Sequence, residues 1–389
     1  MAGIVVRPRA RILHGHDWVY ATEVLKTFGS PATGDVISIK DGRDRLLGSA
    51  IYNPSSQIVA RRISRRRQGL DAEFFVRRIA HAVAWREAAG RDLELCRLIW
   101  SEADGLPGVI ADRYADVVVL QTLTFAMDLH KEMIAAELLR LPGVKTIVER
   151  NDSAIRQAEG LPEVAGLLAG REPGKRIVSM GGVRFEVDFL GGQKTGLYLD
   201  QADNARAVAA QAEGRTVLDA FSNQGGFALA CAREGARSVT AIESGADSVA
   251  RLRRNASLND SELEVFQENV FDCLPALEKA GRKFDLIVLD PPSFTRAKGK
   301  INDALRGYRE LHRLVAPLLE NGGLIATFCC SHHVSESEFT SAVADGLYEG
   351  RRSVNILARM GQATDHPVAL HLPETRYLKG LLLAARPSF

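Results

Sequence analysis

The stretch FDLIVLDPPSF, residues 284–294, decides the fold of the second half of the chain. An almost continuous apolar run ends there in Asp290-Pro291-Pro292, and two prolines terminate a strand because proline has no N–H to donate to a sheet. An apolar run without polar alternation is typical of a strand buried on both faces. We therefore predict an interior strand of a sheet that helices cover on both sides.

Strands and helices alternate on both sides of this stretch. Helical segments are expected near 226–235, 245–258, 273–280 and 302–319, between strand-like runs at TVLDAF (216–221), SVTAIE (238–243), LEVFQEN (263–269) and GLIATFCC (323–330). This alternation predicts an α/β fold with a parallel, doubly wound sheet. The sheet should close with an antiparallel pair, VNILARMG (354–361) and YLKGLLLAAR (377–386), because the segment between them is too short for a helical crossover.

The first half of the chain has a different pattern. Residues 1–70 contain short alternating segments punctuated by Gly, Pro and Asp, which predict a small β-barrel. A helix is predicted over 72–90, with an apolar face at Phe75, Val76, Ile79, Val83 and Trp85. Residues 96–185 predict a small α+β unit. At about 150 residues per domain, we expect three domains: a barrel at 1–70, a central domain at 71–188 and an α/β domain at 189–389.

Composition indicates a globular protein with a local basic region. The net charge is +2, yet residues 1–70 hold twelve Lys or Arg against five Asp or Glu, with a maximum in RRISRRR (61–67). A basic patch on a nearly neutral chain suggests phosphate contacts, although a solvated surface strand would look the same. No apolar run approaches the roughly 18 residues of a membrane span, and no signal peptide is recognisable, so we expect a cytoplasmic protein.

Three strand ends predict a binding site for an adenosine-bearing cofactor. Gly225 and Gly226 lie between a strand and a helix, where they let a ligand approach the backbone and the helix N-terminus. Glu243 ends the next strand, eighteen residues past Gly225, where a carboxylate can accept both hydroxyls of a ribose. Residues 268–271 end the third and could cover an adenine. The glycine turn alone would also suit a nicotinamide dehydrogenase, but it lacks G-x-G-x-x-G.

The Asp-Pro-Pro turn favours one cofactor over the other. It resembles the motif by which S-adenosylmethionine-dependent methyltransferases position a base next to the methyl donor. Upstream, FLGGQKTGLYLDQADNA (189–205) offers polar groups of both signs, which suit a zwitterionic methionine moiety. Alternatively, its glycines form plain turns and Asp200 caps a helix.

The resemblance extends over nearly the whole chain, in order. The segments that carry it are HDWVY (16–20), SEADGLPGVIADRY (101–114), GGQKTGLYLDQADNA (191–205), FSNQGGFAL (221–229), DPPSF (290–294), TFCCS (327–331) and DHPVALHLPETRYLKG (365–380). They resemble the RlmI-type 23S rRNA (cytosine-5) methyltransferases. That family has an N-terminal PUA domain, a central α+β domain and a class I Rossmann-like methyltransferase domain with a seven-stranded sheet.

The resemblance implies methyl transfer from S-adenosylmethionine to C5 of a cytosine in ribosomal RNA of the large subunit. The basic surplus of the barrel favours RNA as its partner, and we assign the RNA contacts to Arg61, Arg62 and Arg65, although a barrel that only packs against the rest of the protein is the alternative. The implied cofactor contacts are Gln193, Lys194, Thr195, Asp200, Gln201, Asp219, Phe221, Ser222, Gly225, Gly226, Phe227, Glu243, Ser244, Asn269, Val270, Asp290 and Pro291.

Methylation at C5 of cytosine requires a nucleophile, because C5 becomes reactive only after a thiolate adds to C6. Adjacent strand residues face opposite sides, so Cys329 and Cys330 are poorly placed to share a metal, and a disulfide between neighbours is strained. The remaining cysteines, Cys96, Cys231 and Cys273, form no C-x2-C pair, so no zinc site is expected. The family pattern TFSCS aligns with residues 327–331 and implies that Cys330 is the nucleophile. Asp290 is expected to hydrogen-bond the cytosine edge.

Some features of the same region depart from the family or leave questions open. His332 and His333 stand where the family has a small and an apolar residue, and Ser293 occupies the place of a second cysteine found in many RNA cytosine-5 methyltransferases. Ser335 and Glu338 have the spacing of a capping box and predict a helix start. The alternatives are a guanine or adenine nitrogen methyltransferase of rRNA without a covalent intermediate, and an inactive RNA-binding protein. The expected partner is ribosomal RNA, no membrane is expected, and a homodimer is left open.

Overall fold

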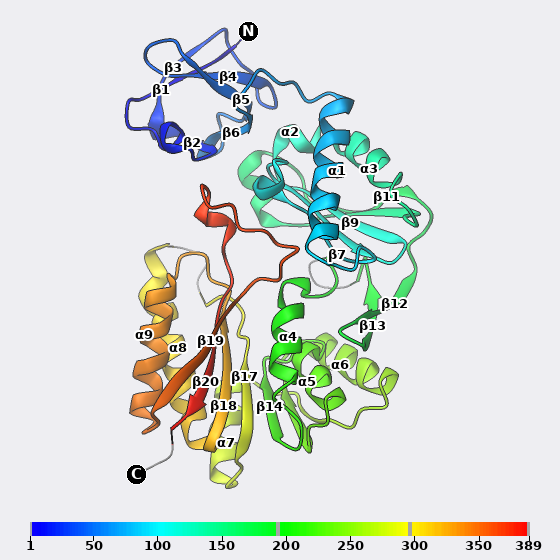
Figure 1. The fold of residues 1–389 in the computed structure, drawn as a ribbon, viewed down its shortest axis with the longest axis vertical. Helices are drawn as coiled ribbons and strands as arrows, with labels where there is room; N and C mark the ends of the chain where they lie inside the picture. The colour runs from blue at the N-terminus through cyan, green and yellow to red at the C-terminus, as the bar shows by residue number, and fades with distance from the viewer. Residues whose placement is uncertain (1, 192–194, 295–297, 387–389) are drawn as a thin grey trace. The chain divides into compact units, whose positions relative to one another are not determined.

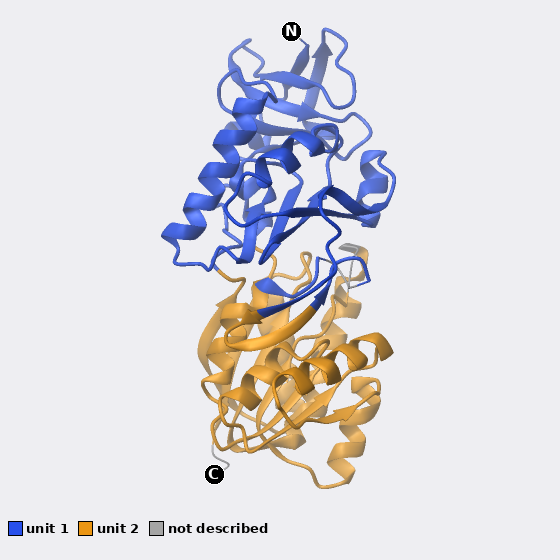
Figure 2. Cartoon of the chain, turned by 90° about the vertical axis from the view of Figure 1, so that its right-hand side faces the viewer, with its two compact units in different colours: residues 1–178, 187–199, 364–375 blue, residues 179–186, 200–363, 376–389 orange. Residues whose placement is uncertain are grey.

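The computed structural model describes residues 2–191, 195–294 and 298–386. The chain divides into two compact units, coloured separately in Figure 2. Unit 1 comprises residues 1–178, 187–199 and 364–375, and unit 2 comprises residues 179–186, 200–363 and 376–389. In the described part of the chain, no helix has both the length and the apolar content to cross a membrane. The three-domain division at residues 70 and 188 stays a prediction.

Unit 1 begins with a six-stranded sheet in the region predicted to be a barrel. Its order is β2-β6-β5-β4-β1-β3, and only the β1–β4 pair is parallel. Ile37 and Ile39 lie in the core of this sheet, and Ser38 between them is buried as well. The strands are β1 (Gly3–Val6), β2 (Trp18–Tyr20), β3 (Val24–Phe28), β4 (Val36–Lys40), β5 (Leu46–Tyr52) and β6 (Ile58–Ser64).

A second, five-stranded sheet follows in the order β11-β10-β9-β8-β7. The helices of this part are α1 (Ala72–Ala88), which Asp71 caps by accepting from the N–H of Phe74, α2 (Phe125–Asp128) and α3 (Lys131–Leu138). The strands are β7 (Leu95–Trp100), β8 (Val109–Tyr114), β9 (Val117–Thr122), β10 (Thr146–Asn151) and β11 (Val164–Gly170), and β12 (Lys175–Met180) pairs with β13 (Val183–Asp188) in a separate two-stranded sheet.

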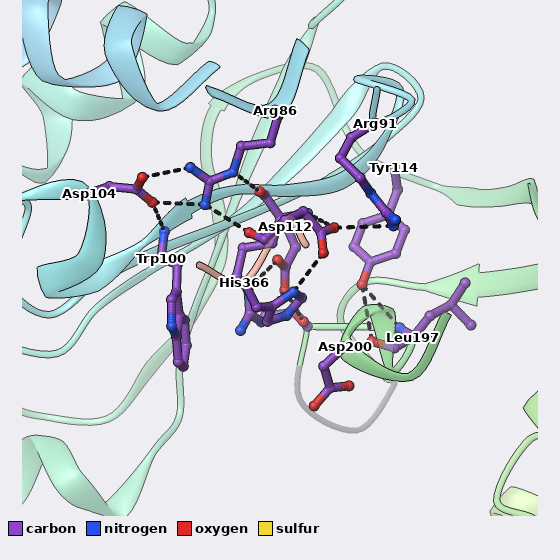
Figure 3. Close-up of polar contacts among 12 residues, drawn as sticks. Arg86, Arg91, Trp100, Asp104, Asp112, Tyr114, Leu197, Asp200 and His366 are labelled. Atoms are coloured by element: carbon purple, nitrogen blue, oxygen red, sulfur yellow. Dashed lines mark hydrogen bonds and ion pairs between the residues drawn. The ribbon is translucent and has the colours of Figure 1, made fainter. Parts of the chain in front are cut away.

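The predicted apolar face of α1 is partly wrong. Phe75 and Ile79 are buried, but Val76 and Trp85 are 37% and 52% exposed. A fully buried arginine takes the place expected for the tryptophan: Arg86 forms two hydrogen bonds with Asp104, of 2.6 and 2.8 Å, in the arrangement of Figure 3. Burying that charge is tolerated because its partner and nearby carbonyl groups satisfy it.

The segment 364–375 belongs to unit 1 although it lies between two strands of unit 2. Arg86 donates to the backbone oxygen of Asp365 at 2.8 Å, and the N–H of Arg97 donates to the Asp365 carboxylate at 3.0 Å. The Asp365 side chain is fully buried. These contacts attach the segment to α1 and β7.

Unit 2 contains the predicted seven-stranded sheet, in the order β16-β15-β14-β17-β18-β20-β19. The first five strands of this order are parallel, and β20 is antiparallel to both of its neighbours. The predicted α/β fold with an antiparallel closing pair is confirmed. The strands are β14 (Thr216–Ala220), β15 (Ser238–Ile242), β16 (Glu264–Phe266), β17 (Phe284–Leu289), β18 (Leu319–Cys329), β19 (Val354–Gly361) and β20 (Lys379–Ala385).

Helices cover both faces of this sheet. Ile287 and Leu218 face the core formed with α7, α8 and α9, whereas Val288 and Val217 face the core formed with α4, α5 and α6. In Figure 1, α8 and α9 lie together on one side of the strands, and α4, α5 and α6 lie on the other. The helices are α4 (Ala202–Ala209), α5 (Gly226–Arg233), α6 (Ala246–Leu258), α7 (Val270–Lys279), α8 (Ile301–Val315) and α9 (Glu336–Glu349).

Candidate active site

Four parallel strands place their final side chains along one edge of the unit 2 sheet. Asp219 lies near the end of β14, Glu243 follows β15, Asp290 follows β17 and Cys330 follows β18. The carboxyl ends of parallel strands are where ligands bind in open α/β folds. The structure therefore brings together residues that are up to 111 positions apart in the sequence.

The turn between β14 and α5 has an unusual backbone. Phe221 and Asn223 have φ angles of 66° and 50°, and Gly225 has 92°. Left-handed non-glycine residues are strained, and such strain concentrates at ligand sites. The turn is held by Ser222, whose hydroxyl donates to the backbone oxygen of Asp219 at 2.6 Å, and by the N–H of Asn223, which donates to Glu243 at 2.9 Å.

Asp219 has one carboxylate oxygen without a partner. Its Oδ2 accepts from the N–H of Ala228 at 2.9 Å, but the buried Oδ1 has no hydrogen-bond partner among the residues that the structure describes. Burial raises the pKa of Asp219 to about 7, and the charges of Asp290 and Glu243 act in the same direction. An unsatisfied buried acceptor is costly unless a ligand supplies a donor. This oxygen, next to the Gly225 turn, fits a cofactor that carries N–H or O–H groups.

The other predicted cofactor residues are placed as follows. Glu243 is half-buried and accepts from the N–H of Gly245 at 2.8 Å, while Ser244 beside it is exposed. Asn269 caps α7 by accepting from Phe271 at 2.9 Å, and Val270 is buried in the core. Glu243 and Ser244 follow β15 directly, whereas β16 ends at Phe266, so Asn269 and Val270 belong to the start of α7 and not to the strand end predicted for the adenine contact.

The segment predicted to bind the methionine moiety is divided. Gln193 and Lys194 lie outside the described residues. Thr195 belongs to unit 1, where its hydroxyl donates to Asp112 at 2.6 Å, and Asp200 and Gln201 belong to unit 2. In unit 2, Asp200 accepts from the hydroxyl of Tyr377 at 2.6 Å, and Gln201 accepts from Asn204 at 2.6 Å. The methionine contacts remain predictions.

The two adjacent cysteines face opposite sides of the sheet. Cys329 is fully buried in the core with α7, α8 and α9, whereas Cys330 packs against the other core and is half-buried. The Sγ of Cys330 lies 3.9 Å from the backbone oxygen of Pro291, on the neighbouring strand end. The remaining three cysteines are buried, and burial raises the pKa of Cys96 to about 12 and of Cys273 to about 11. Of the five thiols, Cys330 is the accessible one.

Polar contacts fix the backbone on both sides of Cys330. Ser331 is buried, and its hydroxyl shares a hydrogen bond of 2.9 Å with the hydroxyl of Ser293, which follows the Asp-Pro-Pro turn. The capping box predicted at Ser335 and Glu338 is confirmed, with reciprocal bonds of 2.8 and 3.2 Å, and α9 starts at Glu336. The turn after β17 and the loop after β18 are therefore tied together.

Sequence reasoning missed Lys379. This residue pairs with Cys329 across β18 and β20, is 6% exposed, and donates from its ammonium group to the backbone oxygens of Ser331 and Val334. Burial lowers the pKa of Lys379, and the thiols of Cys329 and Cys330 oppose that shift. The sequence feature that could have indicated a buried lysine is its isolated position at the start of the apolar run LKGLLLAA.

The unexplained histidines are placed differently from each other. The ring of His332 stacks on Tyr377, with centroids 5.6 Å apart. Partial removal of this ring from water lowers the pKa of His332, and the charges of Lys379 and His333 add to that shift. His333 is exposed. His332 is therefore connected, through Tyr377, to Asp200.

Of the three arginines predicted to bind RNA, only Arg65 is exposed. Arg61 pairs with Glu102, and Arg62 pairs with Asp17 at 2.7 Å with only 7% of its side chain exposed. Because both guanidinium groups already hold carboxylates, we retain Arg65 alone as a proposed RNA contact.

Comparison with known proteins finds two different family models, one in the N-terminal region and one further along the chain. A family model for S-adenosylmethionine-dependent methyltransferases matches residues 152–344, and a model for a PUA-like domain matches residues 7–65. A protein assigned as an S-adenosylmethionine-dependent methyltransferase from Streptococcus mutans has a TM-score of 0.84 at 21% identity, covering 99% of this chain and 100% of its own. That likeness shows the fold.

Sequence relatives cover almost the whole chain. Proteins named ribosomal RNA large subunit methyltransferase I are 37% identical over 382 residues in Tolumonas auensis, with 96% of each chain covered, and 39% identical over 377 residues in Shewanella denitrificans, with 94% covered. The glycine turn, the unpaired Asp219 oxygen and the Asp-Pro-Pro turn are consistent with the cofactor of such enzymes. The chain belongs to the ribosomal RNA large subunit methyltransferase I family of S-adenosylmethionine-dependent methyltransferases.

Proposed function

We propose that the protein methylates C5 of a cytosine in 23S ribosomal RNA through a covalent bond between Cys330 and C6 of that base. The observation that carries this proposal is the position of Cys330, the one accessible thiol, at 3.9 Å from the backbone of the Asp-Pro-Pro turn. The names of the relatives support ribosomal RNA as the substrate.

The cofactor is held, in this proposal, at the ends of β14 and β15 and at the start of α7. Glu243 accepts the ribose hydroxyls, Asn269 and Val270 adjoin the adenine, and the unpaired oxygen of Asp219 accepts a donor from the ligand. When bound there, S-adenosylmethionine supplies an electrophilic methyl group. The strained turn at Phe221–Gly225 lets the ligand approach the N-terminus of α5.

Cys330 performs the step that makes C5 reactive. Its thiolate forms a bond to C6, and the electron pair of the C5–C6 double bond moves to C5, which can then take the methyl group. Loss of the C5 proton to a base restores the double bond and expels the thiolate. We assign to Asp290, which follows the adjacent strand β17, a hydrogen bond to the cytosine edge that favours the activated form of the base.

A trapping experiment tests this chemistry directly. With 23S rRNA transcribed from 5-fluorocytidine triphosphate, the proton at C5 is replaced by fluorine, so elimination fails and the protein stays bound to RNA. We expect a denaturation-resistant complex with the wild type and with Cys329→Ala, and none with Cys330→Ala. In unmodified RNA, mass spectrometry should locate 5-methylcytidine. Methylation by Cys330→Ala, or a methylated nitrogen in guanine or adenine, would overturn the proposal.

A further inference from the structure

Unit 1 contains a pocket of about 440 Å³ that shares no residue with the proposed active site. Its walls are the end of β6, one face of α1, the turn after β7 and residues 367–371. This volume lies in the range of small-ligand sites, which begins at about 300 Å³. The pocket is therefore large enough for a nucleotide.

The α1 wall presents three side chains on one helical face. Arg78, His81 and Trp85 are spaced by three and four residues, so they follow one another along the helix. The indole of Trp85 is 52% exposed, and His81 is exposed as well. An exposed aromatic face inside a pocket is a surface on which a planar ligand can stack.

The acidic residues of the pocket are already paired. Asp17 accepts from Arg62 and from His371, each at 2.7 Å, Glu102 pairs with Arg61, and Asp104 pairs with the buried Arg86. Their negative charge is therefore compensated within the fold.

Two cations of the pocket have no such acidic pairing. Arg65 is exposed and forms no ion pair in the described part of the chain. Arg78 donates to a neutral group, the backbone oxygen of Ile63, at 2.7 Å. A pocket with paired acids and unpaired guanidinium groups attracts anions, and guanidinium binds phosphate through parallel hydrogen bonds.

We propose that this pocket binds one unpaired nucleotide of an RNA strand, with the base stacked on Trp85 and the phosphate held by Arg65 and Arg78. An unpaired nucleotide fits because a base within a duplex has no free face for stacking. The proposal rests on the proposed function, which makes RNA the substrate, and it assigns a second RNA contact remote in sequence from Cys330.

Binding of a short RNA by the full-length protein tests the pocket. The probe is a fluorescein-labelled, unstructured RNA of about ten nucleotides, measured by anisotropy against salt concentration. We expect Trp85→Ala to weaken binding about tenfold, as for loss of one stacked base. Arg65→Ala should also weaken binding and should reduce the slope of log K against log salt by about 0.7.

Two control variants match these changes elsewhere. Tyr348→Ala removes an aromatic ring that is 81% exposed, and Arg253→Ala removes an exposed arginine of α6. Both should bind the probe as the wild type does. The proposal is overturned if Trp85→Ala and Arg65→Ala bind the probe as their controls do. It is also overturned if Trp85→Ala weakens the binding of duplex RNA as much as the binding of the probe. A third contrary result is a glutamate-rich peptide that displaces the probe from the wild type but not from Trp85→Ala.

The covalent trap separates this proposal from the proposed function. At saturating 5-fluorocytidine RNA, Trp85→Ala should still form the adduct, because the pocket contributes affinity and not chemistry. If the wild-type protein forms no adduct, the cytosine-5 mechanism is refuted. The anisotropy comparison would still show whether the pocket binds RNA.

Discussion

The ammonium group of Lys379 lies 2.6 Å from the backbone oxygen of Ser331, the residue that follows Cys330. A second bond of 2.8 Å reaches Val334, so one buried cation holds the loop between β18 and α9 at both ends. Because Lys379 stands opposite Cys329 in the sheet, it also places a positive charge near both thiols. We regard Lys379 as a positioning residue for Cys330.

Replacing this lysine should make Cys330 less reactive. Lys379→Met keeps the aliphatic stem but removes the charge, so the Cys330 thiolate loses a nearby stabilising cation and should form only at higher pH. The measurement is the rate of alkylation by iodoacetamide against pH, in which the midpoint should move to higher pH. Lys279→Met, on the exposed surface of α7, is the control. An unchanged midpoint in a folded Lys379→Met would contradict the assignment.

Asp219 should make the free protein less stable as pH rises. The folded-state pKa of about 7 lies above the ordinary aspartate value of 3.8, so folding favours the protonated form. This contribution is complete below about pH 4 and is lost as pH rises through 7; a shift of about three units corresponds to an upper limit of about 4 kcal/mol.

The variant Asp219→Asn isolates that effect. We expect a flatter dependence of the melting temperature on pH, higher stability than the wild type at pH 8, and weaker binding of S-adenosylmethionine by calorimetry. Asp247→Asn, at an exposed site of α6, should change none of these. A wild-type pH profile that already matches Asp219→Asn would refute the raised pKa.

Tyr377 should control the titration of His332. The stacked ring partly shields the imidazole from water and so contributes to its lowered pKa. In Tyr377→Ala the imidazole regains water, and the pKa of His332 should move up towards the usual 6.5. Proton NMR of the histidine ring signals gives the pKa, with Tyr377→Phe as the control that keeps the ring. If His332 has the same pKa in Tyr377→Ala and in Tyr377→Phe, stacking on the ring is not the cause of its lowered pKa.

Arg86 should be important for the stability of unit 1. In Arg86→Met the carboxylate of Asp104 loses its buried partner, and the expected loss of unfolding free energy is about 3–5 kcal/mol. Chemical denaturation measures this loss, and hydrogen exchange should show faster exchange within 364–375, which Arg86 holds through Asp365. Arg77→Met, on the same helix but in an exposed pair with Glu73, should cost under about 1 kcal/mol.

The sheet of unit 2 could be predicted because its strands are buried on both faces. Runs such as FDLIVL contain almost no polar residue, so length and the intervening helices identify them. The predicted ends of these strands then located Asp219, Glu243, Asp290 and Cys330 at one edge. By contrast, the sequence predicts only an α+β unit over 96–185 and does not identify β11 and β12, because their side chains are largely half-buried or exposed and glycines interrupt β11.

Other features depend on contacts between residues far apart in the chain. Trp85 was assigned to the buried face of α1, since hydrophobicity cannot show that Arg86 would find Asp104 and Asp365 inside the protein. Lys379 likewise depends on carbonyl groups almost fifty residues away. Polar groups are buried only where such partners exist, and a sequence pattern does not contain that information.

The assignment of 364–375 to unit 1 has a genetic consequence. The chain passes from one unit to the other five times, and the last excursion leaves after β19 and returns to form β20. No single cleavage can release either unit as one uninterrupted polypeptide. A frameshift or stop codon soon after residue 363 would remove residues 364–375 from unit 1 and residues 376–389 from unit 2. A truncation at this point therefore damages both units together.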